Sequence, residues 1–597
     1  MPPIPHGAEA RALPPCDLVM KGGITSGIVY PPVVKVLAER YRFANIGGTS
    51  AGAIAAAVTA AAEYGRQLDN GGGIERLDAA LEDLRQPGVL LGLFQPTPQN
   101  RPLFEVLFGA RPRRDAGSVE AAEPASGRRR FWPLAKRVAA IVRIATRARS
   151  GTRLTAVLAA AALTALAVAA FDTLPAFVAV ILAVAAVGVA LLVVIAMAVL
   201  ALGLLAWQTY RSLDTTDYGM CPGTNQEHRG EDALIDWLDK HIQYCAGRSP
   251  TDPPLTLGEL RRQDITLTVM TTDLSFARPV RIPDDLGGYL FDPKELRGRF
   301  PKRVVDAMLT DAAKSDERSA ARHQWIPTDD LPVLVAARFS LSFPILLSAM
   351  PLYLPNPVTA CVARHVFSDG GISSNFPVQF FDAWFPGHPT FGIDLAGHAE
   401  GEPDSVFMPP DPVELLLPRL SEVGSLATFV ANIIDTMQNW RDSLQSELPG
   451  FRDRICQIRM SAREGGLALN MDPKVVAHLI DLGDMAGQRI LTTFDDQRWE
   501  DHQWIRYLTM MSQLQGNLQK AGKPFAVFGP ALADGLPNVD FDIYRKGRGI
   551  QWCRSAGKAT TDLVAQAGTW GPPPQCIDFC GEDLPTPLPV MRVVPVA

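Results

Sequence analysis

The chain has 597 residues, which is long for one domain and predicts two or three structural units. Its apolar fraction of 47% is sufficient for a large core, and its net charge of −6 gives no reason to expect a nucleic-acid-binding protein. The eight cysteines are scattered, so they are expected to be reduced thiols rather than a disulfide framework. Cys576 and Cys580 have no second ligand pair nearby, so neither a metal nor another cofactor is expected.

The first residues lack a basic region followed by an apolar run, so they do not predict a secretory signal. Strands are then predicted at 16–20 and 42–46, and each is followed by a glycine-containing turn and a helix. The second helix is expected over 53–64. This alternation predicts an α/β fold with a parallel sheet covered by helices.

The turn after the second strand matches the pattern G-x-S-x-G, with Ser50 between Gly48 and Gly52. A strand before such a turn and a helix after it is the context that a nucleophile elbow requires. The alternative is a packing turn, since glycine and alanine let neighbouring elements approach closely. After the first strand, Gly22 and Gly23 open another helix, so their N–H groups can form an oxyanion hole.

A long apolar insert follows these elements. Two segments, 154–171 and 176–206, contain no charged residue, and a membrane span needs roughly 20 apolar residues. Asp172 and Pro175 lie between them and are typical turn residues, so a transmembrane helical hairpin is predicted. A buried hairpin inside a soluble protein is the alternative. Residues 128–153 are rich in Lys and Arg and contain no acid, which predicts a surface helix and places the catalytic part on the cytoplasmic side.

A serine nucleophile needs a base, and none of the nine histidines lies in a turn whose sequence would mark it as that base. His365 is expected to be structural. Asp369 ends a short apolar run and enters a glycine pair, so it is the alternative base, although an aspartate at this position is also common in simple turns.

Together these motifs resemble the patatin-like phospholipases. The resemblance rests on the early glycine turn, on G-x-S-x-G, and on Asp369-Gly370-Gly371 followed by Asn375 and Pro377. The segment "ARFSLSFP" (337–344) is similar to the family's segment before the aspartate, and "TTDLSFARPV" (271–280) is similar to a central strand. The resemblance covers the chain from about Asp17 to Asp394, interrupted by the insert.

The resemblance implies a Ser–Asp dyad in which Ser50 is the nucleophile and Asp369 the base. Gly22, Gly23 and the backbone N–H of Ile24 would form the oxyanion hole. Support for the aspartate would come from three residues of the second motif, Gly370, Gly371 and Asn375. The family commonly has a basic residue in the oxyanion turn where this chain has Ser26, which puts anion stabilisation there in doubt.

The implied fold is a patatin-like three-layer α/β/α sandwich with a mainly parallel sheet, a transmembrane hairpin and a mainly helical C-terminal extension. The expected units are 1–110 and 208–396 for the two parts of the catalytic domain, 111–153 for the basic linker, 154–207 for the hairpin and 397–597 for the extension with its Pro-rich tail. Since Ser50 and Asp369 flank the insert, the insert must cross the membrane an even number of times.

The implied function is a membrane-anchored serine acyl hydrolase acting on phospholipid or another acyl-ester lipid. Two alternatives remain open from the sequence. One is an acyltransferase with the same dyad, and the other is a catalytically inactive membrane scaffold or sensor.

Overall fold

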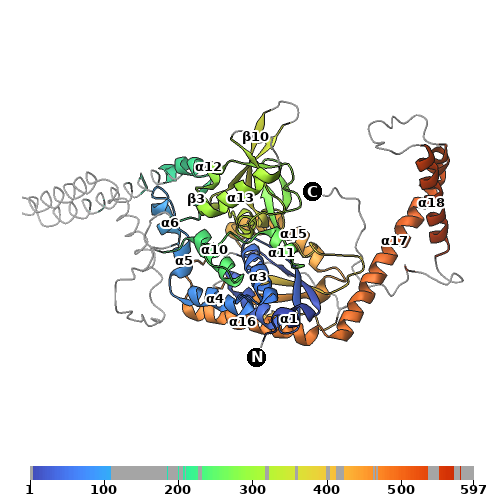
Figure 1. The fold of residues 1–597 in the computed structure, drawn as a ribbon, viewed down its shortest axis with the longest axis horizontal. Coiled ribbons are helices and arrows are strands. Elements are labelled where there is room, and N and C mark those ends of the chain that lie inside the picture. Colours follow the sequence, from blue (N-terminus) through green and yellow to red (C-terminus); the bar gives the residue numbers. More distant parts are fainter. Residues whose placement is uncertain are drawn as a thin grey trace, which may run out of the picture.

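The fold is taken from a computed structural model of the chain, which describes residues 4–23, 25–108, 210–225, 231–315, 322–356, 361–398, 404–411, 423–461, 464–465, 468–534, 550–570 and 579, with scattered positions between 185 and 208. Within these residues the centre of the molecule is an 11-stranded mixed sheet with helices around it (Figure 1).

Five parallel strands form the middle of the sheet, in the order β13–β11–β1–β2–β4. Their bounds are Ile455–Met460, Thr390–Gly397, Pro15–Met20, Arg42–Thr49 and Thr266–Asp273. Antiparallel strands extend both edges: β12 (Val406–Phe407) pairs with β13, whereas β10 (Val362–Asp369), β9 (Met350–Pro355), β6 (Leu290–Phe291) and β7 (Gln324–Trp325) follow β4. The strands predicted at 16–20 and 42–46 are therefore confirmed as β1 and β2, and parallel pairing is confirmed for the centre of the sheet.

The segment 271–280 differs from the expected single strand. It contains the end of β4, a turn, and the start of β5 (Arg278–Ile282), which returns antiparallel to β4. The Asp273 carboxylate accepts hydrogen bonds from the N–H groups of Ser275 (2.8 Å) and Phe276 (3.2 Å), and Ala277 has a positive φ of 52°. These local contacts reverse the chain where the sequence pattern predicted a continuous strand.

Helices surround the sheet, and α3 (Ala51–Leu68) runs from the turn that carries Ser50. The other helices are α1 (Gly7–Ala12), α2 (Tyr30–Leu37), α4 (Leu77–Arg85), α5 (Val89–Leu93), α6 (Arg101–Phe108), α10 (Leu234–Cys245), α11 (Leu257–Arg261), α12 (Pro293–Leu296), α13 (Lys302–Ser315), α14 (Val333–Ser340), α15 (Leu426–Ser446), α16 (Pro473–Thr493), α17 (Asp496–Ala533) and α18 (Ile550–Gly568), with 3-10 turns η1 (Ser26–Val29), η2 (Ile74–Arg76), η3 (Gly370–Ile372) and η4 (Arg452–Arg454).

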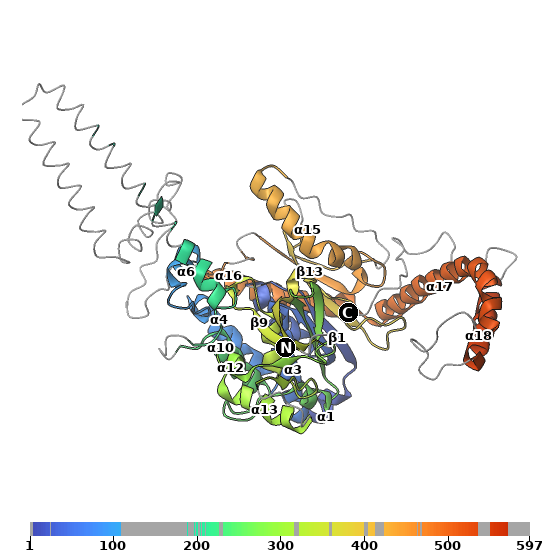
Figure 2. The ribbon, with the colours of Figure 1, turned by 90° about the horizontal axis from the view of Figure 1, so that it is seen from above.

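The two faces of the sheet carry different cores. Successive strand residues point to opposite faces, so Leu18 and Met20 of β1 belong to the main core, whereas Val19 packs in a second cluster with Phe376 and Phe451. In Figure 2, α3, α10 and α13 lie on one side of the sheet and α15 lies on the other. Helices on both sides of a sheet fit an α/β/α fold.

The C-terminal part of the chain completes this sheet and its cover. β13 pairs with β11, and α16 packs against α2 so closely that a Cβ on Gly483 would stand 2.3 Å from the carbonyl oxygen of Val29. α17, which contains Pro524 and Pro530, and α18 both lie in the segment 397–597 that was expected to be mainly helical. Figure 1 shows α17 and α18 extending away from the sheet as a helical pair.

A second, two-stranded sheet lies next to the main one. It pairs β3 (Gly219–Cys221), which follows the insert, in parallel with β8 (Ile345–Leu347). The predicted hairpin itself, like the basic linker and the Pro-rich tail, lies outside the described residues apart from scattered positions in the second apolar run. A search of the described residues alone finds no helix with the length and apolar character of a membrane span.

Candidate active site

Ser50 occupies the turn between β2 and α3. Its backbone has a positive φ of 53° with ψ −125°, which is uncommon for a residue that is not glycine. Ser50 is the N-cap residue of α3, and its own N–H donates to the hydroxyl of Ser340 at 3.1 Å. The side chain is buried, with 4% of its surface exposed. Such a strained strand–turn–helix is the backbone geometry of a nucleophile elbow.

The two glycines of the motif allow this turn to pass against β1. A Cβ on Gly52 would stand 2.3 Å from the carbonyl oxygen of Met20, and a Cβ on Gly48 would stand 2.6 Å from the backbone of Gly52. These obstacles are backbone atoms, which cannot rotate away as a side-chain end can. Positions 48 and 52 therefore require glycine for close approach.

Asp369 is the last residue of β10 and the N-cap of η3. Its Oδ1 accepts the N–H of Gly371 at 2.8 Å, and its own N–H donates to the carbonyl of Ser342 at 3.0 Å. Its backbone carbonyl accepts the hydroxyl of Thr272 at 2.9 Å. The neighbouring Gly370 packs against β4, where a Cβ would stand 2.0 Å from the carbonyl oxygen of Met270.

Burial changes the acid–base behaviour of Asp369. Desolvation raises the pKa of its carboxyl group from 3.8 to about 7, against the lowering effects of the Gly371 N–H, the Ser50 hydroxyl and the Arg338 charge. Oδ2 makes no hydrogen bond of ordinary geometry within the described part of the chain. A carboxyl group with this pKa can accept a proton near neutral pH.

The glycine turn after β1 lies directly beside Ser50. A Cβ on Gly22 would stand 3.0 Å from the Cβ of Ser50 and 2.2 Å from Oδ1 of Asn375. The N–H of Gly22, however, donates to the backbone carbonyl of Asn375 at 2.9 Å. That carbonyl also accepts the hydroxyl of Thr49 at 2.8 Å, so Asn375 holds the glycine turn and the elbow together.

The remaining predicted oxyanion donors are Gly23 and Ile24. Gly23 is closely packed, since a Cβ there would stand 2.5 Å from the hydroxyl oxygen of Ser26 and 2.9 Å from Leu395. Ile24 lies outside the described residues, so its part in the site stays a prediction from the sequence.

Sequence reasoning missed Asp442, which lies on α15 in the C-terminal part. Its carboxylate is buried and accepts three hydrogen bonds: from the Ser374 hydroxyl at 2.8 Å, the Asn375 N–H at 2.6 Å and the Phe376 N–H at 2.8 Å. Asp442 thereby fixes the loop that follows Asp369. No sequence signal marks it, because a single aspartate on an amphipathic helix has no distinguishing pattern.

His365 is buried on β10, and its Nδ1 pairs with Asp273 at 2.8 Å. The same carboxylate accepts the hydroxyl of Tyr289 at 3.0 Å. The prediction that His365 is structural agrees with this pairing, since its ring nitrogen is engaged at the end of β4 and not with Ser50.

Comparisons with known proteins show the family of this chain. The family model described as patatin-like phospholipase matches residues 18–178. The RpoH suppressor of Rhizobium meliloti (strain 1021) is 34% identical over 576 residues, which cover 84% of this chain and 85% of that protein. The crystal structure of VipD from Legionella pneumophila is similar with a TM-score of 0.28 and 12% identity, over 92% of this chain and 88% of that one. The chain therefore carries a patatin-like phospholipase domain and belongs to the same family as the RpoH suppressor.

Proposed function

We propose that this protein is a serine hydrolase that cleaves acyl esters of phospholipids through Ser50 and Asp369. The observation that carries the proposal is the strained Ser50 at the start of α3 beside a buried carboxyl group whose pKa lies at about 7. A general base is most effective when its pKa is near the working pH. The family match supports the broader class, a carboxylic ester hydrolase acting on lipids.

In the proposed reaction, Oγ of Ser50 attacks the ester carbonyl carbon as its proton moves to the Asp369 carboxylate. The tetrahedral intermediate then collapses, the bond to the alcohol breaks, and Asp369 returns the proton to the leaving oxygen. Water attacks the acyl-enzyme and gives a proton to Asp369. Collapse of the second intermediate releases the fatty acid and regenerates the Ser50 hydroxyl.

The negative charge on the attacked oxygen needs hydrogen-bond donors that are not already engaged. Since the N–H of Gly22 donates to Asn375, we assign the main donation to the amides of Gly23 and Ile24. The start of α3 adds the positive end of its helix dipole near Ser50.

Two observations favour the alternative, an inactive membrane scaffold: the engaged amide of Gly22, and Ser26 where the family commonly has a basic residue. A fluorophosphonate probe separates the hydrolase from the scaffold, because it reacts only with an activated serine. We expect the wild type to be labelled and Ser50→Ala to remain unlabelled. Equal labelling of both proteins would refute the hydrolase.

The lipid products identify the reaction type. Mass spectrometry of phospholipid vesicles treated with wild type, and with Ser50→Ala as the matched control, should show free fatty acid only with the wild type. Transfer of the acyl chain to a second alcohol, without free fatty acid, would assign an acyltransferase instead.

We further propose that the apolar insert anchors the enzyme by two membrane spans with the catalytic domain on the cytoplasmic side. Two features support this. The insert has the length and basic flank described above, and β2 before it pairs with β4 after it in one sheet. Protease protection in sealed vesicles tests it: cleavage sites near residues 40 and 380 should share one face, and opposite faces would refute the paired spans.

A further inference from the structure

Arg338 is a fully buried arginine on α14, and the hydrogen bonds that its guanidinium makes within the described residues all go to neutral oxygens. Its two terminal nitrogens donate to the hydroxyl of Ser342 at 2.7 Å, to the carbonyl of Ser348 at 2.7 Å and to the carbonyl of Pro222 at 3.4 Å. These contacts fix the side chain without neutralising it. A buried charge of this kind is costly, so a compensating charge nearby is expected.

The charge of Arg338 acts on Asp369. Ser342, which accepts from Arg338, uses its backbone carbonyl to accept the N–H of Asp369 and the hydroxyl of Ser368, both at 3.0 Å. Ser342 therefore links Arg338 to Asp369 through hydrogen bonds to both residues. Its charge lowers the pKa of Asp369, and burial lowers the pKa of Arg338 itself to about 9, so the guanidinium is charged at neutral pH.

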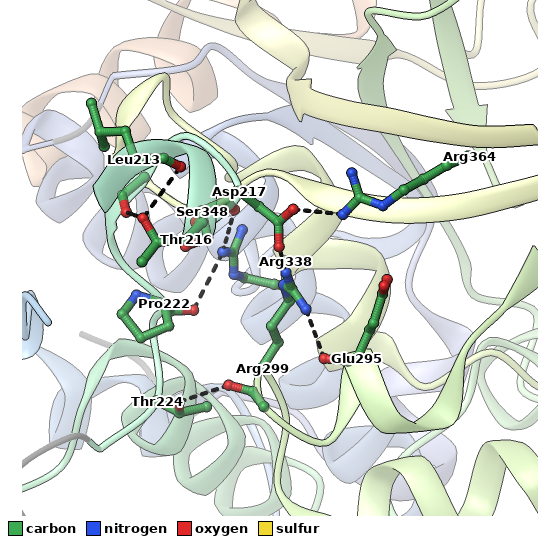
Figure 3. Close-up of polar contacts among 12 residues, drawn as sticks. Leu213, Thr216, Asp217, Pro222, Thr224, Glu295, Arg299, Arg338, Ser348 and Arg364 are labelled. Atoms are coloured by element: carbon green, nitrogen blue, oxygen red, sulfur yellow. Dashed lines mark hydrogen bonds and ion pairs between the residues drawn. The ribbon is translucent and has the colours of Figure 1, made fainter. Parts of the chain in front are cut away.

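Figure 3 shows a charged cluster close to Arg338, in which Asp217 lies between Arg299 and Arg364. Asp217 pairs with Arg299 and, at 2.5 Å, with Arg364 on β10. The positive charge of Arg299 repels that of Arg338 and lowers the pKa of the Arg338 guanidinium. Asp217 lies in the segment between the insert and β3, at a positive φ of 49°, and its backbone carbonyl accepts the N–H of Ala349 at 2.8 Å.

We propose that Arg338 is a positioning residue that keeps the carboxyl group of Asp369 ionised for catalysis, and that Asp217, which pairs with Arg299 and Arg364, lowers the total positive charge of this cluster. The proposal rests on the Ser50–Asp369 reaction described above. Arg338 does not touch the substrate in this role, because it is covered on all sides. It acts through the electrostatic potential at Asp369 and through the hydrogen bonds of Ser342.

The rate of fluorophosphonate labelling at Ser50, measured as a function of pH, tests this role. Labelling requires ionised Asp369, so it rises with pH through the pKa of that group. Arg338→Met removes the positive charge, so we expect the rise to move to higher pH by about one unit, with the lost rate recovered under alkaline conditions. Arg338→Lys retains the positive charge, so the rise in labelling rate should move to higher pH by a smaller amount.

Asp217→Asn provides the matched variant with the opposite sign. It removes a negative charge from the same cluster, which strengthens the positive potential at Asp369, so the rise should move to lower pH. Asparagine is well tolerated at positive φ, which favours correct folding of this variant. If Arg338→Met does not fold, Arg338→Lys and Asp217→Asn still carry the comparison.

The labelling results distinguish a failure of the proposed hydrolase from a failure of the role proposed for Arg338. If the wild type is not labelled at Ser50, the proposed hydrolase fails and this inference fails with it. The other negative result is a labelled wild type with variants whose labelling rate rises at the same pH as that of the wild type, or is reduced by the same fraction at every pH. In that case Arg338 is only structural, and this inference alone is overturned.

Discussion

Replacing Asp369 by asparagine should abolish activity and also stabilise the protein, and the stabilisation should depend on pH. The carboxyl group has a pKa of about 7 when folded, against 3.8 when exposed. Between these two values the unfolded chain has released this proton while the folded protein still holds it, so wild-type stability falls as the pH rises. A difference of about three pKa units corresponds to roughly 4 kcal/mol, which is an upper limit.

Asparagine keeps the acceptor for the Gly371 N–H and carries no charge at any pH. Thermal unfolding of wild type and Asp369→Asn should therefore coincide below about pH 4 and diverge up to about pH 7, with the variant melting at the higher temperature. Asp435→Asn, on the exposed face of α15, is the control for loss of one negative charge. A melting difference that does not change with pH, or a wild type that is more stable at neutral pH, would refute the argument.

Three further predictions concern the surroundings of the dyad. Asp442→Ala leaves three buried donors without an acceptor, at a cost of about 1–3 kcal/mol each, so the melting temperature and the labelling rate should both fall. Asp442→Asn should retain most of both. If Asp442→Ala has the melting temperature and labelling rate of the wild type, Asp442 does not fix the loop. Gly52→Ala forces α3 away from β1 and should lower the labelling rate about 100-fold, since displacements of about 1 Å have that effect. The control is Gly516→Ala, where a Cβ meets nothing within 4 Å, and it should leave the rate unchanged. Equal labelling rates in the two variants would contradict the argument. Ser340→Ala removes the acceptor for the Ser50 N–H and should slow labelling more than it lowers melting temperature; unaltered labelling kinetics would exclude a positioning role.

The parts of the fold that depend on local sequence were predictable. The Ser50 turn, its flanking strand and helix, and the need for Gly48 and Gly52 follow from residues within a few positions of each other. The strand β13 lies in the C-terminal part that the sequence predicted to be mainly helical. Its place beside β11 was not predictable, since strand order depends on packing between distant segments.

The supporting residues of the site were harder to predict for the same reason. Asp442 reaches the loop after Asp369 only because α15 folds back across the sheet. Arg338 and Ser340 lie in a segment that the sequence singles out, yet their roles depend on burial and on contacts with Ser342 and Ser50. The pairing of the Gly22 amide with Asn375 likewise joins two turns that are distant in sequence.

The pairing of β2 with β4 has a consequence for the order of folding. β1, β2 and α3 are synthesised first and present Ser50, but the neighbouring strand β4 and the strand β10 that ends in Asp369 follow only after the whole insert. Because chains are made from the N-terminus, the nucleophile waits for its base while the insert leaves the ribosome. In the reaction proposed above, a nascent chain that ends before β10 therefore has the serine but not its base.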